Sequence, residues 1–171
     1  MKTTHPTLYF SNATLHDLPT IVAIYNTTVA SRMVTADTEP VSLESRQQWF
    51  DAHDETKRPL WVVKNTANEM VAWVSFQSFY GRPAYDATVE ISVYVDELHR
   101  GKGIGKSILA YCIEHAPLFG AKTLLGFIFA HNLPSLNLFR YFGFEDWATL
   151  PNIALLDNEE RDLKILGKRI G

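Results

Sequence analysis

The chain has 171 residues, of which 46% are hydrophobic and 20% charged, and its formal net charge is -3. This length fits one compact domain with a full core, and the small negative charge gives no long-range attraction for nucleic acid. The single Cys112 excludes an internal disulfide and lies in an apolar run, so we expect it in the core. No apolar run reaches the roughly 18 residues of a membrane span, and the N-terminus lacks the apolar stretch of a signal peptide. We therefore expect one domain over residues 1–171, without nucleic-acid or membrane partners, in the cytoplasm.

The first half of the chain alternates helical and strand patterns. Apolar residues at helical spacing predict a helix from about residue 15 to residue 29, and Thr14 with Asp17 resembles a capping box. Ser42 can cap a second helix, which carries Trp49 and Phe50. The segments expected next are a strand at 60–64, a turn at 65–69, a strand at 71–79 and a loop at 80–84.

The second half contains a strand, a glycine-rich turn and a helix in succession. Apolar and polar residues alternate over residues 89–95, which predicts a strand. The turn spans residues 100–105, and a helix with an apolar face begins at Ile104. Later segments are a strand at 124–129, a helix from Pro134 that ends before Gly143, and one or two strands of which 163–166 is the clearest. This mixed order predicts an α/β domain.

Backbone N–H groups of a glycine-rich turn at a helix start can bind an anion. A P-loop would need glycine where this chain has Arg100, and a dinucleotide-binding turn would need it at Lys106 or at Ile108. The pattern that fits is R-x-x-G-x-G, made by Arg100, Gly103 and Gly105.

This turn resembles the coenzyme A pyrophosphate loop of the GNAT superfamily of N-acetyltransferases. The strand at 89–95, Asn132 to Ser135 and Gly143-Phe144 are similar to that superfamily too. Within it, the chain is most similar to the phosphinothricin and methionine sulfoximine acetyltransferases. The matching words are D-L-P at 17–19, A-I-Y-N at 23–26, T-E-P-V-S-L at 38–43, R-P-A-Y at 82–85, T-V-E at 88–90 and S-V-Y-V at 92–95.

The resemblance implies a GNAT fold, with a mixed central β-sheet flanked by helices, and a homodimer. It also implies acetyl-CoA as cosubstrate, bound by residues of the strand, the glycine turn, the start of the following helix and the later segment at 132–135. These residues are Ser92, Val93, Tyr94, Val95, Arg100, Gly101, Lys102, Gly103, Ile104, Gly105, Lys106, Asn132 and Ser135. The N–H of Val93 or Tyr94 is the expected oxyanion donor. We expect no metal, because His99, His115 and His131 have no ligand spacing.

The chemistry requires a base, because an amine attacks a thioester only with a free lone pair. Glu90 is the candidate, since it lies on the strand face opposite the apolar Val89 and Ile91. Its alternative role is that of a solvent-facing strand carboxylate. Many superfamily members use a tyrosine as general acid where this chain has Phe139, and Tyr141 would point elsewhere on the helix, so we expect no dedicated acid.

The loop before the base combines one guanidinium with three aromatic rings. An arginine offers a planar fork for a carboxylate or tetrahedral anion, although Arg82 could also be an ordinary surface residue. The expected substrate-binding residues are Phe79, Tyr80, Gly81, Arg82, Tyr85, Val89 and Glu90. They predict N-acetylation of a small amino acid or analogue such as methionine sulfoximine, methionine sulfone or phosphinothricin.

Two departures from the relatives concern the acceptor. Ile91 replaces a histidine, and N-E-E-R-D-L at 158–163 replaces a G-R-W-L-D-L-like strand that helps to shape the acceptor end. Two other functions stay open at this point. One is acetylation of protein N-termini or lysines, which uses an open groove, and the other is a non-catalytic acyl-CoA-binding module, which would not need Glu90.

Overall fold

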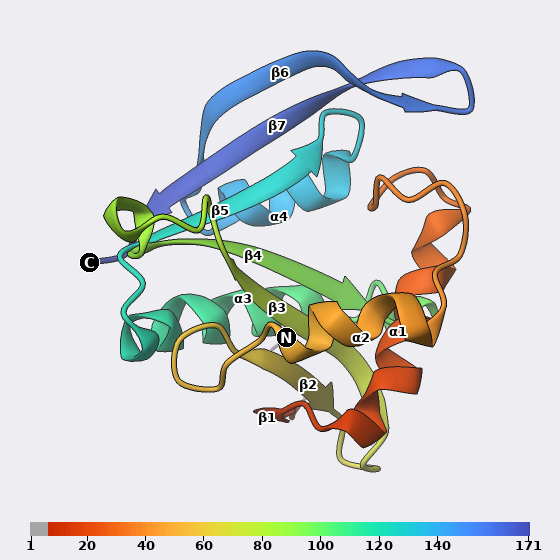
Figure 1. The fold of residues 1–171 in the computed structure, drawn as a ribbon, viewed down its shortest axis with the longest axis vertical. Helices are drawn as coiled ribbons and strands as arrows, with labels where there is room; N and C mark the ends of the chain where they lie inside the picture. Colours follow the sequence, from red (N-terminus) through yellow and green to blue (C-terminus); the bar gives the residue numbers. More distant parts are fainter. Residues whose placement is uncertain (1–6) are drawn as a thin grey trace, which may run out of the picture.

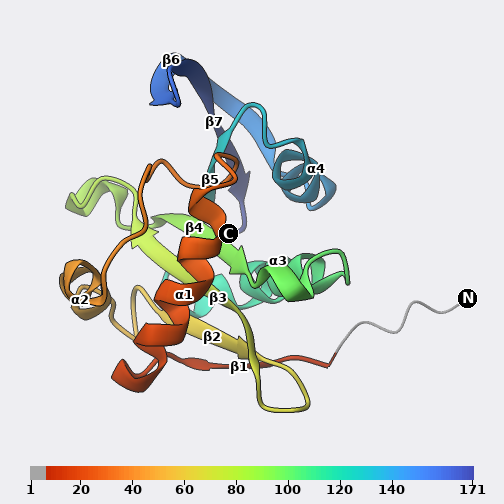
Figure 2. The ribbon, with the colours of Figure 1, turned by 90° about the vertical axis from the view of Figure 1, so that its right-hand side faces the viewer.

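Seven strands form one mixed sheet in the order β1-β2-β3-β4-β5-β7-β6. The computed structural model describes residues 7–171, so the expected lack of a signal peptide, which concerns the first residues, lies partly outside the described part. Helices α1 and α2 lie on one face of the sheet and α3 on the other, with α4 beside β5 (Figures 1 and 2). The expected α/β architecture with a mixed, helix-flanked sheet is confirmed.

From α1 to α4 the element bounds agree closely with the sequence pattern. The helices are α1 (Leu18–Val29), α2 (Leu43–Asp51), α3 (Ile104–His115) and α4 (Leu133–Tyr141). The strands are β1 (Tyr9–Asn12), β2 (Leu60–Lys64), β3 (Met70–Ser78), β4 (Thr88–Val95), β5 (Thr123–Phe129), β6 (Glu145–Leu156) and β7 (Glu159–Arg169). Within residues 7–171, no helix is long and apolar enough to cross a bilayer.

Local caps explain where the first two helices begin. The Thr14 N–H donates to the Asp17 carboxylate at 2.8 Å, and a 3-10 turn over Leu15–Asp17 precedes the α-helix. The helix expected from residue 15 therefore starts as a 3-10 turn. The Ser42 hydroxyl accepts the Ser45 N–H at 3.1 Å and caps α2 as predicted.

The sheet opens in its middle, between β4 and β5. These parallel strands pair only where Thr88 to Glu90 meet Thr123 to Leu125, whereas β5 pairs with β7 along its whole length. The two strands then diverge, as Figure 1 shows. Beyond Glu90, one edge of β4 therefore has no partner strand.

Two hydrophobic clusters cover the opposite faces of the sheet. The larger packs α3 and α4 against the central strands and contains Cys112, which is fully buried as expected. The smaller packs α1 against β2 and β3 around Trp73. The two clusters fix α1 and α3 on opposite sides of β4, where the chemistry is expected.

The C-terminal segment is a longer hairpin than the sequence pattern indicated. Strands β6 and β7 meet at Asp157 and Asn158, whose φ angles of 50° and 64° are those of a tight two-residue turn that matches strand twist. The expected strand at 163–166 is the middle of β7. The short β1 was not predicted.

Candidate active site

The glycine turn borders a groove of about 410 Å³, called here the glycine groove. Of the thirteen expected cofactor residues, ten line it. They are Val93, Tyr94, Val95, Arg100, Gly101, Gly103, Ile104, Gly105, Asn132 and Ser135. The end of β4, the start of α3 and the start of α4 thus meet around one groove, as the motif spacing implied.

The backbone at the start of α3 leaves room for an anion. Gly103 is the N-cap residue with φ +77°, and Gly101 has φ +74°, both in the left-handed region that favours glycine. A Cβ built on either glycine would meet no atom within 4 Å. The first N–H groups of α3 are therefore open to the groove, which fits a pyrophosphate.

Three expected cofactor residues do not line the glycine groove. The Lys102 ammonium donates to the Leu98 carbonyl at 3.0 Å, and the Lys106 ammonium lies 3.7 Å from the centre of the Tyr141 ring. Ser92 lies on the other side of the strand opening, as described below. Direct cofactor contacts by the two lysines stay a prediction.

The groove also has walls that the motif did not indicate. The loop after α1 contributes Ser31, Met33 and Val34, together with Thr28 from the helix end. No local pattern marks these residues, because only the packing of α1 against the sheet brings them to the groove.

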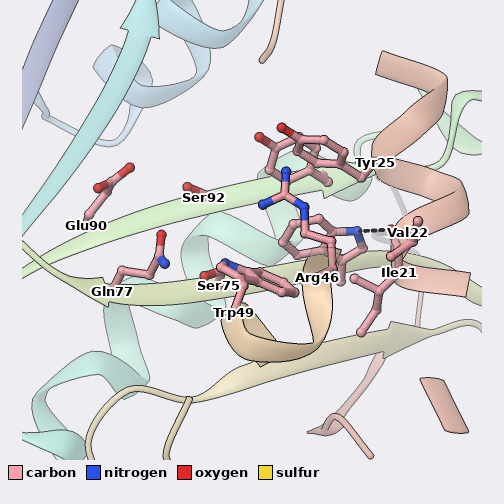
Figure 3. Close-up of a pocket in the computed structure, with 11 residues that line it drawn as sticks. Ile21, Val22, Tyr25, Arg46, Trp49, Ser75, Gln77, Glu90 and Ser92 are labelled. Atoms are coloured by element: carbon pink, nitrogen blue, oxygen red, sulfur yellow. Dashed lines mark hydrogen bonds between the residues drawn. The ribbon is translucent and has the colours of Figure 1, made fainter. Parts of the chain in front are cut away.

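A second cavity, of about 300 Å³, lies on the α1 and α2 side of β4 and is called here the aromatic pocket (Figure 3). Its lining comes from two helices and two strands. The residues are Ile21, Val22 and Tyr25 of α1, Arg46 and Trp49 of α2, Trp73, Ser75 and Gln77 of β3, and Glu90, Ser92 and Tyr94 of β4.

Glu90 faces the aromatic pocket and is half-buried. Its strand neighbours Val89 and Ile91 point the opposite way into the core, and Gln77 is its cross-strand partner. Within residues 7–171 the carboxylate has no hydrogen-bond or ion-pair partner, and burial raises its pKa. An unpaired, partly desolvated carboxylate in a cavity is typical of a general base, unlike a solvent-facing strand residue.

At the far end of the pocket, Arg46 lies among aromatic rings. Its guanidinium is 4.5 Å from the centre of the Tyr25 ring, and its Nη2 donates to Asp37 at 2.7 Å. Asp37 also accepts the Tyr25 hydroxyl, and burial, the largest cause, raises the pKa of that tyrosine. Trp73 stacks on Tyr94 with 4.4 Å between ring centres. These contacts hold the guanidinium in one place.

Ser75 presents a hydrogen-bond acceptor to the same pocket. His53 Nδ1 lies 2.9 Å from the Trp49 carbonyl, and its Nε2 lies 2.9 Å from the Ser75 hydroxyl. Burial lowers the pKa of His53, so the neutral ring donates from Nδ1 to the carbonyl and accepts the serine hydroxyl at Nε2. The Ser75 oxygen therefore keeps its lone pairs for an N–H group.

The opening between β4 and β5 connects the two cavities. A small cavity of about 60 Å³ lies in this opening, and we call this cavity the β4–β5 gap. It shares Ser92 and Tyr94 with the aromatic pocket, and shares Val93, Asn132, Ser135 and Phe139 with the glycine groove. A cofactor in the groove could therefore reach a molecule in the pocket through this opening.

Strand geometry decides between the two expected oxyanion donors. The Asp96 N–H donates to Val71 on β3, and the Thr88 carbonyl accepts from Phe79, so even-numbered residues of β4 bond toward β3. Backbone groups alternate along a strand, so the N–H of Val93 faces the gap and that of Tyr94 faces β3. This geometry favours Val93.

Phe139 lines both the groove and the gap and carries no proton donor. Its ring covers Gly126, where an added Cβ would lie 2.6 Å from it. Tyr141 is 66% exposed and lines none of the three cavities. The position of the usual acid is thus occupied by a ring that shapes the cavity.

The loop expected to bind substrate lies outside the aromatic pocket. Tyr80 is 67% and Tyr85 44% exposed, and neither lines any of these three cavities, nor do Phe79, Gly81 and Arg82. The Arg82 carbonyl accepts the Tyr85 N–H at 2.9 Å, but its guanidinium has no hydrogen bond or ion pair within residues 7–171. The side chain of Val89 is fully buried in the core, because strand alternation points it away from Glu90. The prediction that Val89 binds substrate is therefore wrong for its side chain.

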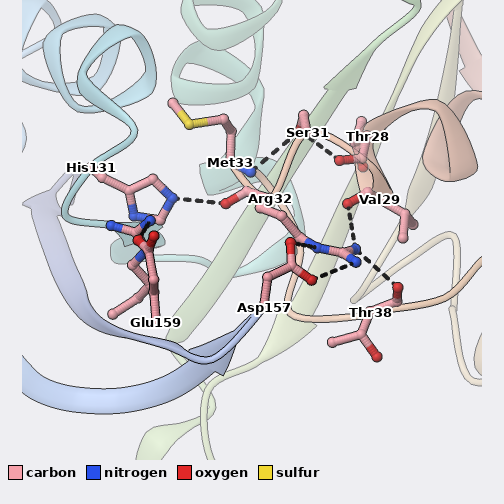
Figure 4. Close-up of polar contacts among 10 residues, drawn as sticks. Thr28, Val29, Ser31, Arg32, Met33, Thr38, His131, Asp157 and Glu159 are labelled. Carbon is pink, nitrogen blue, oxygen red and sulfur yellow. Dashed lines mark hydrogen bonds and ion pairs between the residues drawn. The ribbon is translucent and has the colours of Figure 1, made fainter.

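The loop that follows α1 is tied to the C-terminal hairpin (Figure 4). Arg32 donates from Nε and Nη2 to Asp157 at 2.9 and 3.1 Å, and its carbonyl accepts from His131 at 2.7 Å. This loop supplies Val34 to the groove and Asp37 to Arg46. The turn of the divergent tail therefore helps to position both cavities. Across residues 7–171, no three His, Cys, Asp or Glu side chains cluster as a metal site would require.

The comparisons with known proteins agree with this geometry. A profile of the acetyltransferase (GNAT) family matches residues 21–144. A Bacillus subtilis (strain 168) protein provisionally named as a phosphinothricin acetyltransferase is 52% identical over 154 residues, which are 90% of this chain and 94% of that protein. An L-methionine sulfoximine/L-methionine sulfone acetyltransferase of Pseudomonas paraeruginosa is 35% identical over 84% of this chain and 83% of its own.

A solved Salmonella typhimurium structure, provisionally described as an acetyltransferase with its cofactor acetyl-CoA, is also similar. It has a TM-score of 0.86 and 25% identity, and covers 96% of this chain and 94% of its own. Together with the open glycine turn, the profile and the relatives show that the chain belongs to the GNAT family and is an N-acetyltransferase that uses acetyl-CoA.

Proposed function

We propose that this enzyme acetylates the α-amine of a small amino acid or analogue, of the methionine sulfoximine, methionine sulfone or phosphinothricin type. The observation that carries this proposal is the aromatic pocket. Its volume of about 300 Å³ is at the lower end for small-molecule sites, and its walls combine four aromatic residues with five polar or charged ones. The names of the relatives favour the same class of acceptor.

Two features of the pocket disfavour the other two functions. A peptide acceptor would need an extended groove, whereas helices α1 and α2 close this cavity on one side (Figure 3). A non-catalytic binding module would have no use for the unpaired Glu90 carboxylate beside the gap. Costly burial of a charge without a partner is expected where that charge acts.

The proposed roles follow from position. Bound acetyl-CoA supplies a thioester whose carbonyl carbon forms the new bond to nitrogen. Glu90 takes a proton from the ammonium group of the acceptor, directly or through water. The hydroxyl oxygens of Ser75 and Ser92 accept hydrogen bonds from the N–H groups of the same ammonium. The Val93 N–H stabilises the negative oxygen that develops in the gap. The thiol leaves as thiolate or takes a proton from water, since Phe139 cannot donate one.

A thiol-release assay tests the acceptor class. The purified chain is given acetyl-CoA and a panel of free amino acids, including the three analogues, acidic and aromatic amino acids, short peptides and polyamines. We expect the highest kcat/KM with one of the free amino acids or analogues. Preference for a peptide or polyamine over every free amino acid would refute the proposed acceptor while leaving the family unchanged.

We also propose a homodimer that acts in the cytoplasm, where acetyl-CoA is available. Exposed apolar side chains on β6, Trp147, Ile153 and Leu155, favour a partner surface there. Light scattering coupled to size exclusion should give twice the chain mass of 19.4 kDa.

A further inference from the structure

We propose that Arg46, and not the exposed loop before Glu90, holds the α-carboxylate of the acceptor and so selects amino acids over simple amines. This inference rests on the proposed function and names the residue that sets its specificity. Arg46 comes from α2, a helix that the glycine-turn motif does not include.

The charge inventory of the aromatic pocket is the first observation. Among its eleven lining residues, Arg46 is the one cation and Glu90 the one anion. Without Arg46, an acceptor carboxylate would enter a partly desolvated cavity that holds only negative charge, from Glu90 and from the nearby Asp37. Like charges in such a cavity repel strongly, so an amino acid needs a compensating cation there.

The second observation is that the guanidinium has donors to spare. An arginine side chain carries five N–H donors, and the single hydrogen bond that the Arg46 guanidinium makes within residues 7–171 uses Nη2, to Asp37. Its side chain is 24% exposed. Asp37 thus orients the guanidinium without satisfying it, and the remaining N–H groups stay available for a carboxylate.

Rigid support is the third observation. Arg46 lies over the Tyr25 ring at 4.5 Å and near the Trp49 ring at 5.8 Å. Stacking on aromatic faces and the Asp37 contact already restrict the rotamers of Arg46 in the free protein, so the side chain loses less conformational entropy when a ligand binds. A pre-ordered fork of this kind suits a planar carboxylate.

Placement relative to the reacting centre is the fourth. Ser92 lines both the pocket and the β4–β5 gap, so the amine must lie near it to meet the thioester. Glu90 lies on one side of Ser92 and Arg46 on the other, as Figure 3 shows. An α-amino acid with its amine at Ser92 can then direct its carboxylate to Arg46. Its side chain then extends past Glu90 toward the loop that joins β3 to β4.

The test compares two acceptors that differ only in the carboxylate. L-methionine sulfone and its decarboxylated analogue, 3-(methylsulfonyl)propylamine, are assayed with the wild type, Arg46→Met, Arg46→Lys and Arg140→Met. The last is a matched control, because Arg140 also pairs with an aspartate, Asp146, but lines none of the cavities. Binding of L-methionine sulfone is measured in parallel by calorimetry without acetyl-CoA.

We expect Arg46→Met to raise KM and Kd for L-methionine sulfone about ten- to hundredfold, with a smaller change in kcat. KM for the decarboxylated amine should change by less than about twofold. Arg46→Lys should recover part of the loss, and Arg140→Met should behave as the wild type. The ratio of the two acceptors within one variant remains informative even if Arg46→Met lowers stability.

Equal losses for both acceptors, or no loss for either, would overturn the role of Arg46 while the acceptor class stands. Equal kcat/KM of the wild type for the decarboxylated amine and for the amino acid would overturn it too. Failure of the wild type with every free amino acid would instead refute the proposed function, and the carboxylate site with it.

Discussion

The glycine groove and the aromatic pocket lie on either side of β4 but are built in different ways. Half of the eighteen groove residues come from one continuous stretch, residues 93–105, and the rest come from α4 with its N-cap and from the end of α1 with the loop that follows it. The pocket takes its residues from four elements, between Ile21 and Tyr94. The pyrophosphate of the cosubstrate can be bound by a local backbone motif. The acceptor is recognised by side chains that come together only when the chain folds. Changes in the two regions should therefore affect different kinetic quantities.

The largest effect should come from the base in the pocket. Glu90→Gln keeps the size of the side chain but removes its basicity, so kcat/KM should fall about 10²–10⁴-fold. Because burial raises the pKa of Glu90, the acidic limb of the wild-type profile should lie above the usual glutamate range and should change in the variant. The pH–rate profiles of both proteins measure this. Glu145→Gln, an exposed carboxylate outside the cavities, is the control. Near-normal turnover of Glu90→Gln at all pH values would show that the base is elsewhere.

The same substitution should raise stability. A raised folded-state pKa means that the folded chain binds more protons than the unfolded chain between the two pKa values. The contribution of Glu90 to stability is therefore present below the ordinary glutamate pKa and is lost as pH rises through the raised value. We expect Glu90→Gln to melt at a higher temperature than the wild type at pH 7, with the difference absent in acid. A lower melting temperature at pH 7 would contradict the unpaired, desolvated state of Glu90.

An intermediate effect is expected in the glycine groove. Gly103→Val forces a β-branched residue into φ +77° and places its side chain before the N-terminus of α3, so Kd for acetyl-CoA should rise about tenfold or more. Gly81→Val is matched to it, because Gly81 has φ +64° and open space around it but lies outside the groove. Calorimetry on folded protein should show a change for the first variant only. Unchanged affinity in Gly103→Val would refute pyrophosphate binding at this turn.

The sequence predicted the groove better than the pocket, for a physical reason. Alternation over residues 89–95 and the R-x-x-G-x-G turn are local patterns, and eight residues of these two segments that were expected to bind the cofactor line the groove, together with Asn132 and Ser135 from the family resemblance. Of the residues expected to bind substrate, only Glu90 lines the pocket. The sequence places Trp49 on a predicted helix without indicating a cavity, and no local feature distinguishes Arg46 from a surface arginine. The turn at Asp157 and Asn158 was the available signal for the long hairpin, and it was missed.

The smallest effect, and the one that separates the two arginines, is expected from Arg82. Arg82 lies in the loop that follows β3. This loop is next to the end of the pocket that holds Glu90, and Arg46 lies at the other end. If the acceptor carboxylate meets Arg46, Arg82 can contact only the distal end of the side chain. Arg82→Ala should then lower kcat/KM about tenfold for L-methionine sulfone, whose end is polar, and leave L-norleucine, whose end is apolar, nearly unchanged. Arg82→Lys should recover only part, because a point charge does not replace the planar fork. Equal losses for both amino acids would mean that Arg82 acts on the shape of the loop and not on the substrate. A loss that matches Arg46→Met and is confined to carboxylate-bearing acceptors would assign the carboxylate to Arg82.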